Sequence, residues 1–195
     1  MDKDLRLHGV SPEAREAVRR VLAGGDARGR PFAVVDKKQA RLLVFRADGR
    51  LLGATPALLG AAPGDFSFAG VGRRAGKIAP HERTTPAGRF ESEPGRNHLG
   101  EDIVWVDYDS SLAIHRLRPA AAHERRPERL ASPSPSDNRI SLGCIVVAAS
   151  FFDAIVVPSL GRQRGVVYVL PEFASGVPLL ASHAGGVPNG PGPSP

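Results

Sequence analysis

The stretch Arg-Ile-Ser-Leu-Gly-Cys-Ile-Val-Val, residues 139–147, decides how the rest of the chain is interpreted. It places Cys144, the only cysteine in the sequence, directly after Gly143 and at the start of an apolar, β-branched run. Such a run is typical of a buried strand, so we expect one strand over 140–147 that carries the thiol. A lone cysteine in an apolar run is more often a small buried hydrophobic residue than a nucleophile. A catalytic interpretation therefore requires a base elsewhere in the chain.

A histidine upstream of Cys144 is the best candidate for that base. The thiolate is the attacking form of cysteine, and a neighbouring imidazole generates it. His115 ends the apolar stretch Leu-Ala-Ile-His (112–115), whereas His123 lies in a charged loop. A strand holds a side chain in place better than a loop does, so we favour His115. The only histidine after the thiol, His183, lies in a tail rich in glycine and proline.

The remaining sequence predicts a mostly β (α+β) protein. Ser11 followed by Pro12 predicts the start of a helix, and Gly24-Gly25 predicts its end. A second helix is expected over 148–160, after the cysteine strand. Turn signals and apolar runs predict further strands at 32–36, 41–46, 50–54, from 88 onward, 103–108, 111–117 and 165–170, the last of which closes the sheet.

We expect the chain to have three parts. Residues 1–30 form a helix and linker, residues 31–172 the main domain, and residues 173–195 a Gly/Pro-rich tail that is disordered. Two long loops are expected inside the main domain, at 60–81 and 118–138. Long ordered loops of this kind are often functional.

Composition limits the classes of partner. The net charge is +6 and the pI is about 10.2, which favours anionic partners. Aromatic residues make up 6% of the chain, and no block of lysine and arginine occurs, so we expect no nucleic-acid partner. No apolar run is long enough for an integral membrane span. No spacing of histidine, cysteine or glycine suits a metal or a nucleotide, so we expect neither a metal nor a cofactor.

Three segments together resemble the catalytic domain of L,D-transpeptidases, the YkuD-like domain. Thr-Pro-Ala-Gly-Arg-Phe (85–90) is similar to the family's Thr-Pro-x-Gly-x-Phe segment. Ala-Ile-His (113–115) resembles the strand that carries its catalytic histidine, and Ser-Leu-Gly-Cys-Ile (141–145) resembles its Ser-His-Gly-Cys motif. The predicted hairpin over 32–55 also fits, and the resemblance covers about residues 31–172.

The chain departs from the family pattern near the thiol. Leu142 stands where the family has histidine, and Val146-Val147 replace its usual arginine or asparagine. The gap between His115 and Cys144 is also wider than usual, which keeps His123 as an alternative base. The loop 118–138 would hold the additional residues as an enlarged flap beside the active site.

The resemblance implies a YkuD-like mixed β-sandwich and a two-step acyl transfer. Cys144 would attack a carbonyl of a peptidoglycan stem peptide, with His115 as the base. The backbone N–H groups of Gly143 and Cys144 would form the oxyanion hole. Ser141 would position the loop, and the backbone carbonyl of Arg116 would orient the histidine ring.

Further residues are assigned through the same resemblance. Arg139, Arg96 and Arg116 are candidates to hold stem carboxylates. Asn138 is a further substrate-binding candidate, which would also position the loop, and Trp105 is expected in the core. The resemblance places the protein in the periplasm or cell wall, after removal of an export signal that this chain does not show. Carbapenems are expected to acylate the thiol.

Several alternatives remain open. The crosslinks formed would be of the 3,3 type or the unusual 1,3 L-Ala–diaminopimelate type. The same fold also suits hydrolysis, as an L,D-carboxypeptidase or an amidase. A non-catalytic cell-wall-binding module would keep Cys144 only as a buried side chain, and a basic nucleic-acid binder is a weaker option. Thiol reactivity separates catalysis from binding, because a catalytic thiol is expected to react below its ordinary pKa of about 8.5.

Overall fold

The computed structural model describes residues 9–74 and 77–173, and their fold is mostly β. An eight-stranded mixed sheet and a two-stranded sheet are accompanied by short helices, which confirms the α+β prediction. The start of the part predicted as residues 1–30 and all but the first residue of the predicted tail lie outside the described residues.

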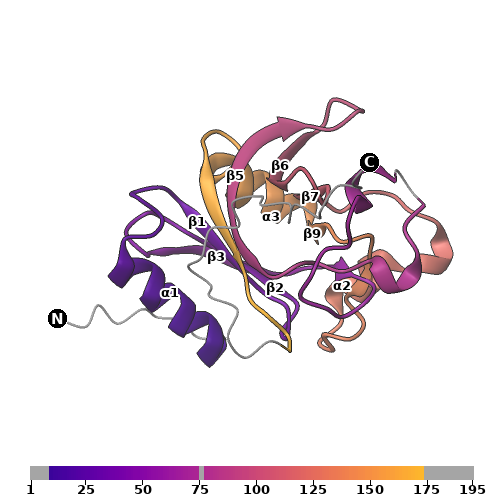
Figure 1. The fold of residues 1–195 in the computed structure, drawn as a ribbon, viewed down its shortest axis with the longest axis horizontal. Helices are drawn as coiled ribbons and strands as arrows, with labels where there is room; N and C mark the ends of the chain where they lie inside the picture. Colours follow the sequence, from indigo (N-terminus) through magenta and orange to yellow (C-terminus); the bar gives the residue numbers. More distant parts are fainter. Residues whose placement is uncertain (1–8, 75–76, 174–195) are drawn as a thin grey trace, which may run out of the picture.

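The strands lie along the chain where they were predicted, except that β4 was not predicted and the strand expected over 140–147 is divided into β8 and β9 (Figure 1). Their bounds are β1 (Phe32–Asp36), β2 (Arg41–Phe45), β3 (Leu51–Pro56), β4 (Leu59–Gly60), β5 (Gly88–Arg96), β6 (Asp102–Asp107), β7 (Leu112–Arg116), β8 (Arg139–Ser141), β9 (Ile145–Val147) and β10 (Gly165–Val169). The α-helical segments are α1 (Pro12–Gly24), α2 (Arg126–Ala131), α3 (Ala149–Phe151) and α4 (Val157–Ser159). Short 3₁₀ turns are η1 (Val71–Arg73), η2 (Pro80–Glu82) and η3 (Ala122–Glu124), and the π-helical segment η4 (Phe152–Val156) joins α3 to α4.

The large sheet has the strand order β3-β2-β1-β10-β5-β6-β7-β9. Strands β1 and β10 pair in parallel, as do β7 and β9, whereas the other neighbours are antiparallel. The prediction that the last strand closes the sheet was wrong, because β10 lies in its middle. All five residues of β10 are buried, as expected for a strand covered on both faces.

Helix α1 covers one face of the central strands (Figure 1). It begins and ends as predicted: the Ser11 hydroxyl accepts a hydrogen bond from the Ala14 N–H, and Gly25 caps the other end with a φ of 61°. The residues that form this core are Ala14, Ala17, Val18, Val21, Phe32, Val34, Leu43, Phe45, Val166 and Tyr168, among others. Leu22, near the end of the helix, is 37% exposed.

The opposite face of the same strands packs on the helical segment that follows β9. Phe152, Val156 and Leu160 are fully buried there. They contact a core that also receives side chains from β6, β7 and β9, including Ile114 and Ile145. One face of β7 and β9 is therefore committed to this core, and the other face carries His115 together with the buried Ala113 and Val146.

The predicted strand over 140–147 is two strands in different sheets. Residues of β8 pair with β4, and residues of β9 pair with β7. The break falls at Leu142–Cys144, where Gly143 has a φ of 138°, a value that favours glycine. Cys144 is therefore at a chain corner rather than inside a strand.

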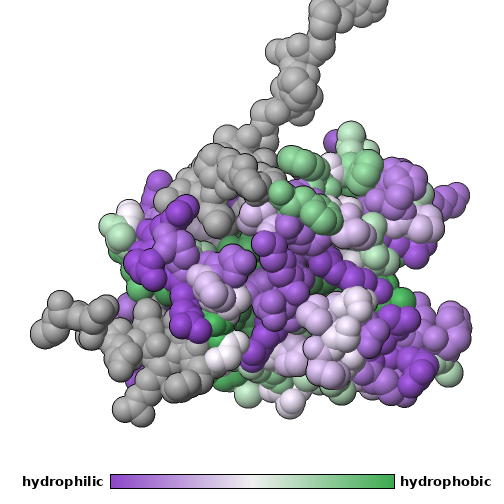
Figure 2. Space-filling model, turned by 90° about the horizontal axis from the view of Figure 1, so that it is seen from below, coloured by the Kyte–Doolittle hydropathy of each residue, from purple (hydrophilic) through white to green (hydrophobic). Residues whose placement is uncertain are grey.

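The loop 118–138 contains η3 and α2, which the sequence analysis did not predict. Leu130 of α2 packs on Leu58 and Val146 in a small separate core. Among the described residues, no helix is both long and apolar enough to cross a membrane. The face shown in Figure 2 is largely hydrophilic, with hydrophobic residues in smaller groups.

Candidate active site

The register of two parallel strands brings Cys144 and His115 to the same face of the sheet. Ile114 lies opposite Ile145, and His115 lies opposite Val146. Because successive residues of a strand alternate between faces, the core-facing pair Ile114 and Ile145 leaves Cys144 and His115 on the other face. Cys144 lies one position before the paired residues, at the level of Ala113. Ordinary strand spacings then put the two Cα atoms roughly 8 Å apart.

The Cys144 thiol is half-buried and donates a hydrogen bond to the backbone carbonyl of Ser111 at 3.3 Å. Burial raises its pKa, against the opposing effects of a backbone hydrogen bond from Ala113 and the charge of Arg118. The group is therefore a neutral thiol at neutral pH, which differs from the expectation that it would react below its ordinary pKa. Its activation depends on a base.

The His115 ring is oriented by its own strand. Its Nδ1 lies 2.9 Å from the backbone carbonyl oxygen of Arg116, the contact that the resemblance implied. A carbonyl only accepts, so Nδ1 carries the proton in this contact, and Nε2 keeps a free lone pair. Burial lowers the pKa of His115, and the charges of Arg118 and Arg126 act in the same direction. The imidazole is thus neutral and able to take a proton.

The described residues include no hydrogen bond between Cys144 and His115 or His123. His123 is exposed on η3, in the loop 118–138. The strand scaffold therefore holds His115 on the thiol's own face of the sheet, while His123 has no comparable support.

Both peptide groups that flank Cys144 are held by hydroxyl groups. The Ser141 hydroxyl accepts from the Gly143 N–H at 3.1 Å and donates to the Cys144 carbonyl at 2.7 Å. The Thr85 hydroxyl donates to the Gly143 carbonyl at 2.7 Å. Ser141 thus links two backbone groups of the loop, the Gly143 N–H and the Cys144 carbonyl. The expectation that the Gly143 N–H serves the oxyanion hole is wrong for this geometry, because Ser141 already accepts that hydrogen.

The predicted substrate-binding residues do not gather around the thiol. Arg139 is largely buried and pairs with Glu172, which argues against a role in holding a substrate. Arg96 is exposed and lies 3.4 Å from Asp102 at the tip of the β5–β6 hairpin. Asn138 is 2% exposed, and its side-chain nitrogen has no hydrogen-bond partner, although its backbone carbonyl accepts from Leu59 at 2.9 Å.

The side chain of Arg116 is also used internally. It forms an ion pair with Asp153 at 2.8 Å, and its guanidinium carbon lies 5.2 Å from the centre of the Phe152 ring. Only its backbone carbonyl faces the histidine, so the guanidinium is not a candidate for binding stem carboxylates.

Two residues of the site were not found from the sequence. Trp105, expected in the core, is half-buried on the same face as His115, because it pairs with Ala113 while Val104 and Val106 point into the core. The alternation in Ile-Val-Trp-Val contained that signal. Arg118, whose charge reaches both Cys144 and His115, pairs with Glu101 at 2.8 Å. No motif marks it, although it follows His115 by three positions.

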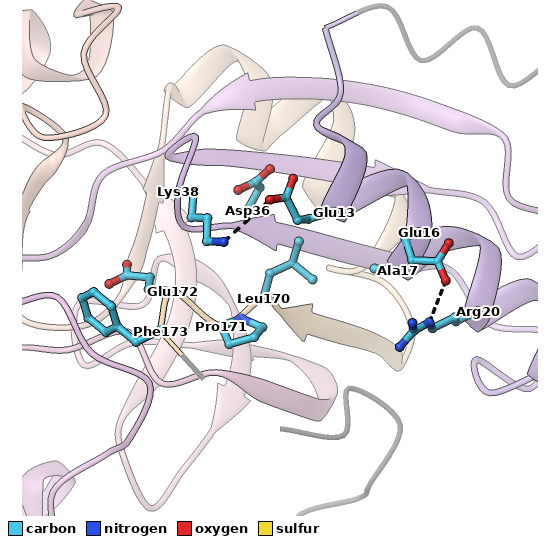
Figure 3. Close-up of a pocket in the computed structure, with 10 residues that line it drawn as sticks. All are labelled: Glu13, Glu16, Ala17, Arg20, Asp36, Lys38, Leu170, Pro171, Glu172 and Phe173. Carbon is cyan, nitrogen blue, oxygen red and sulfur yellow. Dashed lines mark hydrogen bonds and ion pairs between the residues drawn. The ribbon is translucent and has the colours of Figure 1, made fainter. Parts of the chain in front are cut away.

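A pocket of about 280 Å³ lies elsewhere, between α1 and the segment after β10 (Figure 3). Glu13, Glu16 and Asp36 line it together with Arg20 and Lys38. Its polar side chains largely satisfy one another, as in the ion pair of Lys38 with Glu13 at 3.6 Å. Neither the thiol nor the histidine reaches it, so the pocket is not part of the candidate active site.

Neither a protein-family model nor a curated protein sequence matches the chain. Several solved structures are similar to it. An L,D-transpeptidase in complex with imipenem has a TM-score of 0.41 and 20% identity, over 72% of this chain and 58% of that one. The catalytic domain of the E. faecium L,D-transpeptidase has a TM-score of 0.41 and 17% identity, over 73% of this chain and 98% of that one. The L,D-transpeptidase of Xylanimonas cellulosilytica has a TM-score of 0.45 and 15% identity, over 83% of this chain and 71% of that one. These proteins belong to the family that the sequence motifs resemble.

Proposed function

We propose that this protein is a cysteine acyltransferase of the L,D-transpeptidase type that acts on peptidoglycan stem peptides at the cell wall. One observation carries the proposal. Cys144 and His115 share a face of two adjacent parallel strands, and the ring is held by Nδ1 so that Nε2 is free. A neutral thiol and a neutral imidazole on one face of the sheet can start acyl transfer by passing one proton.

In the first step, the thiol turns from the Ser111 carbonyl and gives its proton to His115 Nε2. The sulfur attacks the carbonyl carbon between the diamino acid and the terminal D-amino acid of the stem. The C–N bond then breaks, and the leaving amine takes the proton from His115. The product is a thioester on Cys144 and a free D-amino acid.

In the second step, an amine of a neighbouring stem attacks the thioester carbonyl. His115 takes the proton of that amine and returns it to the sulfur as the C–S bond breaks. Negative charge develops on the carbonyl oxygen in both steps, and we assign its stabilisation to the Cys144 N–H. Attack at the third stem residue gives 3,3 crosslinks, attack at the first gives 1,3 crosslinks, and water in place of the amine gives hydrolysis.

Defined muropeptides with mass-spectrometric product analysis test this function. The wild-type protein is expected to release a D-amino acid and to form a crosslinked dimer, and Cys144→Ala is expected to form neither. His115→Gln should slow the release by about 100-fold or more, which is the scale of general base catalysis. His123→Gln is the matched control and should keep wild-type rates. Loss of activity in the His123 variant alone would overturn the choice of base.

A carbapenem gives an independent test of the nucleophile. Intact-mass analysis should show one adduct per chain, absent from Cys144→Ala. An adduct that persists in this variant would refute the assignment of Cys144.

A second candidate, a non-catalytic cell-wall-binding module, is favoured by the hydrogen bond that the Cys144 thiol donates to the Ser111 carbonyl, together with burial that raises the thiol's pKa. Under that function, Cys144→Ala would bind insoluble peptidoglycan as well as the wild type does, and no carbapenem adduct would form on either protein.

A further inference from the structure

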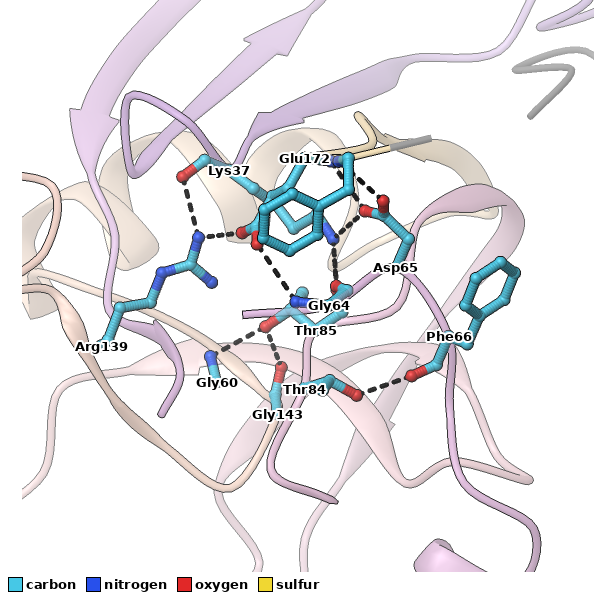
Figure 4. A network of polar contacts seen from close by, with 11 residues as sticks. Lys37, Gly60, Gly64, Asp65, Phe66, Thr84, Thr85, Arg139, Gly143 and Glu172 are labelled. Carbon is cyan, nitrogen blue, oxygen red and sulfur yellow. Dashed lines mark hydrogen bonds and ion pairs between the residues drawn. The ribbon is translucent and has the colours of Figure 1, made fainter. Parts of the chain in front are cut away.

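A buried lysine lies at the start of a chain of contacts that ends at the thiol loop. Lys37 follows β1, and its side chain is fully buried (Figure 4). Its ammonium group donates to the Gly64 carbonyl at 2.6 Å, to the Asp65 carboxylate at 2.8 Å and to the Thr85 carbonyl at 2.9 Å. An ammonium group has three N–H donors, and all of them are used here.

The anchor for this lysine is itself well fixed. The Asp65 carboxylate also accepts from the backbone N–H groups of Glu172 at 2.7 Å and Phe173 at 2.9 Å. The Glu172 carboxylate accepts from the Gly64 N–H at 3.1 Å and pairs with Arg139. The network thus joins the segments after β1, β4 and β10 to the start of β8.

Thr85 connects this hydrogen-bond network to the loop that carries Cys144. Its carbonyl is held by Lys37, and its hydroxyl bridges two backbone groups (Figure 4). The hydroxyl accepts from the Gly60 N–H at 2.9 Å and donates to the Gly143 carbonyl at 2.7 Å. Thr85 is fully buried, so water does not compete for these bonds.

The direction of the Gly143 carbonyl determines the direction of the next N–H. In a trans peptide the C=O and the N–H lie in one plane and point in opposite directions, and the described residues contain no cis peptide. The bond from Thr85 therefore turns the Cys144 N–H away from Thr85. The Gly143 N–H is already bound to Ser141, so this N–H is the donor left for an oxyanion.

We infer that Thr85 and Lys37 are positioning residues, which aim the Cys144 N–H at the oxyanion of the acyl-transfer transition state. The inference rests on the proposed acyl-transfer function, since only an acyl transfer has such an oxyanion. Neither residue touches the substrate. Their effect passes through the Gly143–Cys144 peptide group.

Two reactions of the Cys144 thiol distinguish a change in the direction of the Cys144 N–H from a general disturbance of the structure around the thiol. Acylation by p-nitrophenyl acetate passes through a tetrahedral oxyanion, whereas alkylation by iodoacetamide does not. Thr85→Val removes the bridging hydroxyl with little change of shape. We expect acylation to fall at least about tenfold, because the donor is misdirected rather than removed, and removal of an oxyanion donor costs about 100- to 1000-fold. Alkylation should stay within twofold of the wild type. Thr85→Ser keeps the hydroxyl and should restore acylation.

The lysine is tested by a pair of variants. Lys37→Met leaves the Asp65 carboxylate buried without its ammonium partner and is expected to lower the melting temperature. Lys37→Met combined with Asp65→Asn removes both charges and should recover much of that temperature, but not the acylation rate. Lys38→Met is the control, because that neighbouring side chain is 49% exposed.

The outcomes decide the inference in each case. Equal losses of acylation and alkylation in Thr85→Val, or no loss of either, would overturn it. Recovery of acylation together with the melting temperature in the double variant would make Lys37 a purely structural residue. If neither lysine variant folds, the Thr85 pair decides alone. Neither reagent needs peptidoglycan, so these results are independent of whether the protein crosslinks stem peptides.

Discussion

Replacement of Gly143 by alanine tests the geometry on which the thiol loop depends. Gly143 has a φ of 138°, which L-residues rarely adopt. A Cβ atom added there would lie 2.8 Å from the backbone oxygen of Thr84, closer than real Cβ contacts allow. Thr84 cannot easily move away, because its N–H donates to the Glu82 carbonyl at 2.9 Å and its hydroxyl donates to the Phe66 carbonyl at 2.7 Å.

The expected cost has two parts. A residue forced into a sparsely populated backbone region costs about 1–3 kcal/mol. Displacement of packed backbone by an added methyl group costs about 1–3 kcal/mol more. Together they predict that Gly143→Ala lowers the free energy of unfolding by about 2–6 kcal/mol. At about 2–4 °C per kcal/mol for a chain of this size, the melting temperature falls by roughly 4–24 °C.

Urea unfolding and thermal melting measure this change, with Gly100→Ala as the matched control. Gly100 has a φ of 78°, and no atom lies within 4 Å of its added Cβ, so that variant reports backbone strain alone. It is expected to cost about 1–2 kcal/mol. If Gly143→Ala is no more destabilising than Gly100→Ala, the close approach of Thr84 to the thiol loop is not present in solution.

Three further predictions concern other parts of the molecule. Ser11→Ala removes the N-cap of α1 and should cost about 1 kcal/mol in urea unfolding; an unchanged midpoint would contradict the cap. The hydrogen bond from Arg30, with that from Arg89, lowers the pKa of Glu91 from 4.5 to about 2. The stability advantage of the wild type over Glu91→Gln should therefore be complete above pH 4.5 and disappear as the pH falls through 2. A stability advantage that is independent of pH would refute the pairing. Burial raises the pKa of the Cys144 thiol above its ordinary value, so its alkylation by iodoacetamide should still be rising at pH 9. A plateau below pH 8 would show a thiolate that the structure does not predict.

Local signals predicted much of the fold because the interactions behind them are local. The N-cap Ser11, the proline after it and the glycines after α1 act within one turn of helix, and all three behave as predicted. Apolar runs located β1, β2, β6, β7 and β10 within one or two residues. The contact between His115 and the Arg116 carbonyl also joins sequence neighbours, so the motif was sufficient to predict it.

The predictions were wrong where contacts between distant segments of the chain determine the local structure. The run 140–147 is apolar enough for one strand, but contacts with Thr84 and Thr85 break it at Gly143. Arg139 was a candidate for substrate binding through the resemblance, yet its guanidinium pairs with Glu172, which follows the last strand. Lys37 has no unusual local context, and only the folded chain buries it beside Asp65.

The sequence by itself determined the candidate nucleophile Cys144, the preferred candidate base His115 and the strand that carries that histidine, because residue type and alternation are local properties. Only the tertiary structure decided which backbone N–H is free beside Cys144, that its thiol is neutral, and which arginines lie near it. These properties depend on burial and on hydrogen-bond partners from segments far apart in the chain. The stretch 139–147 supplies the thiol, and the residues packed around it determine how that thiol can react.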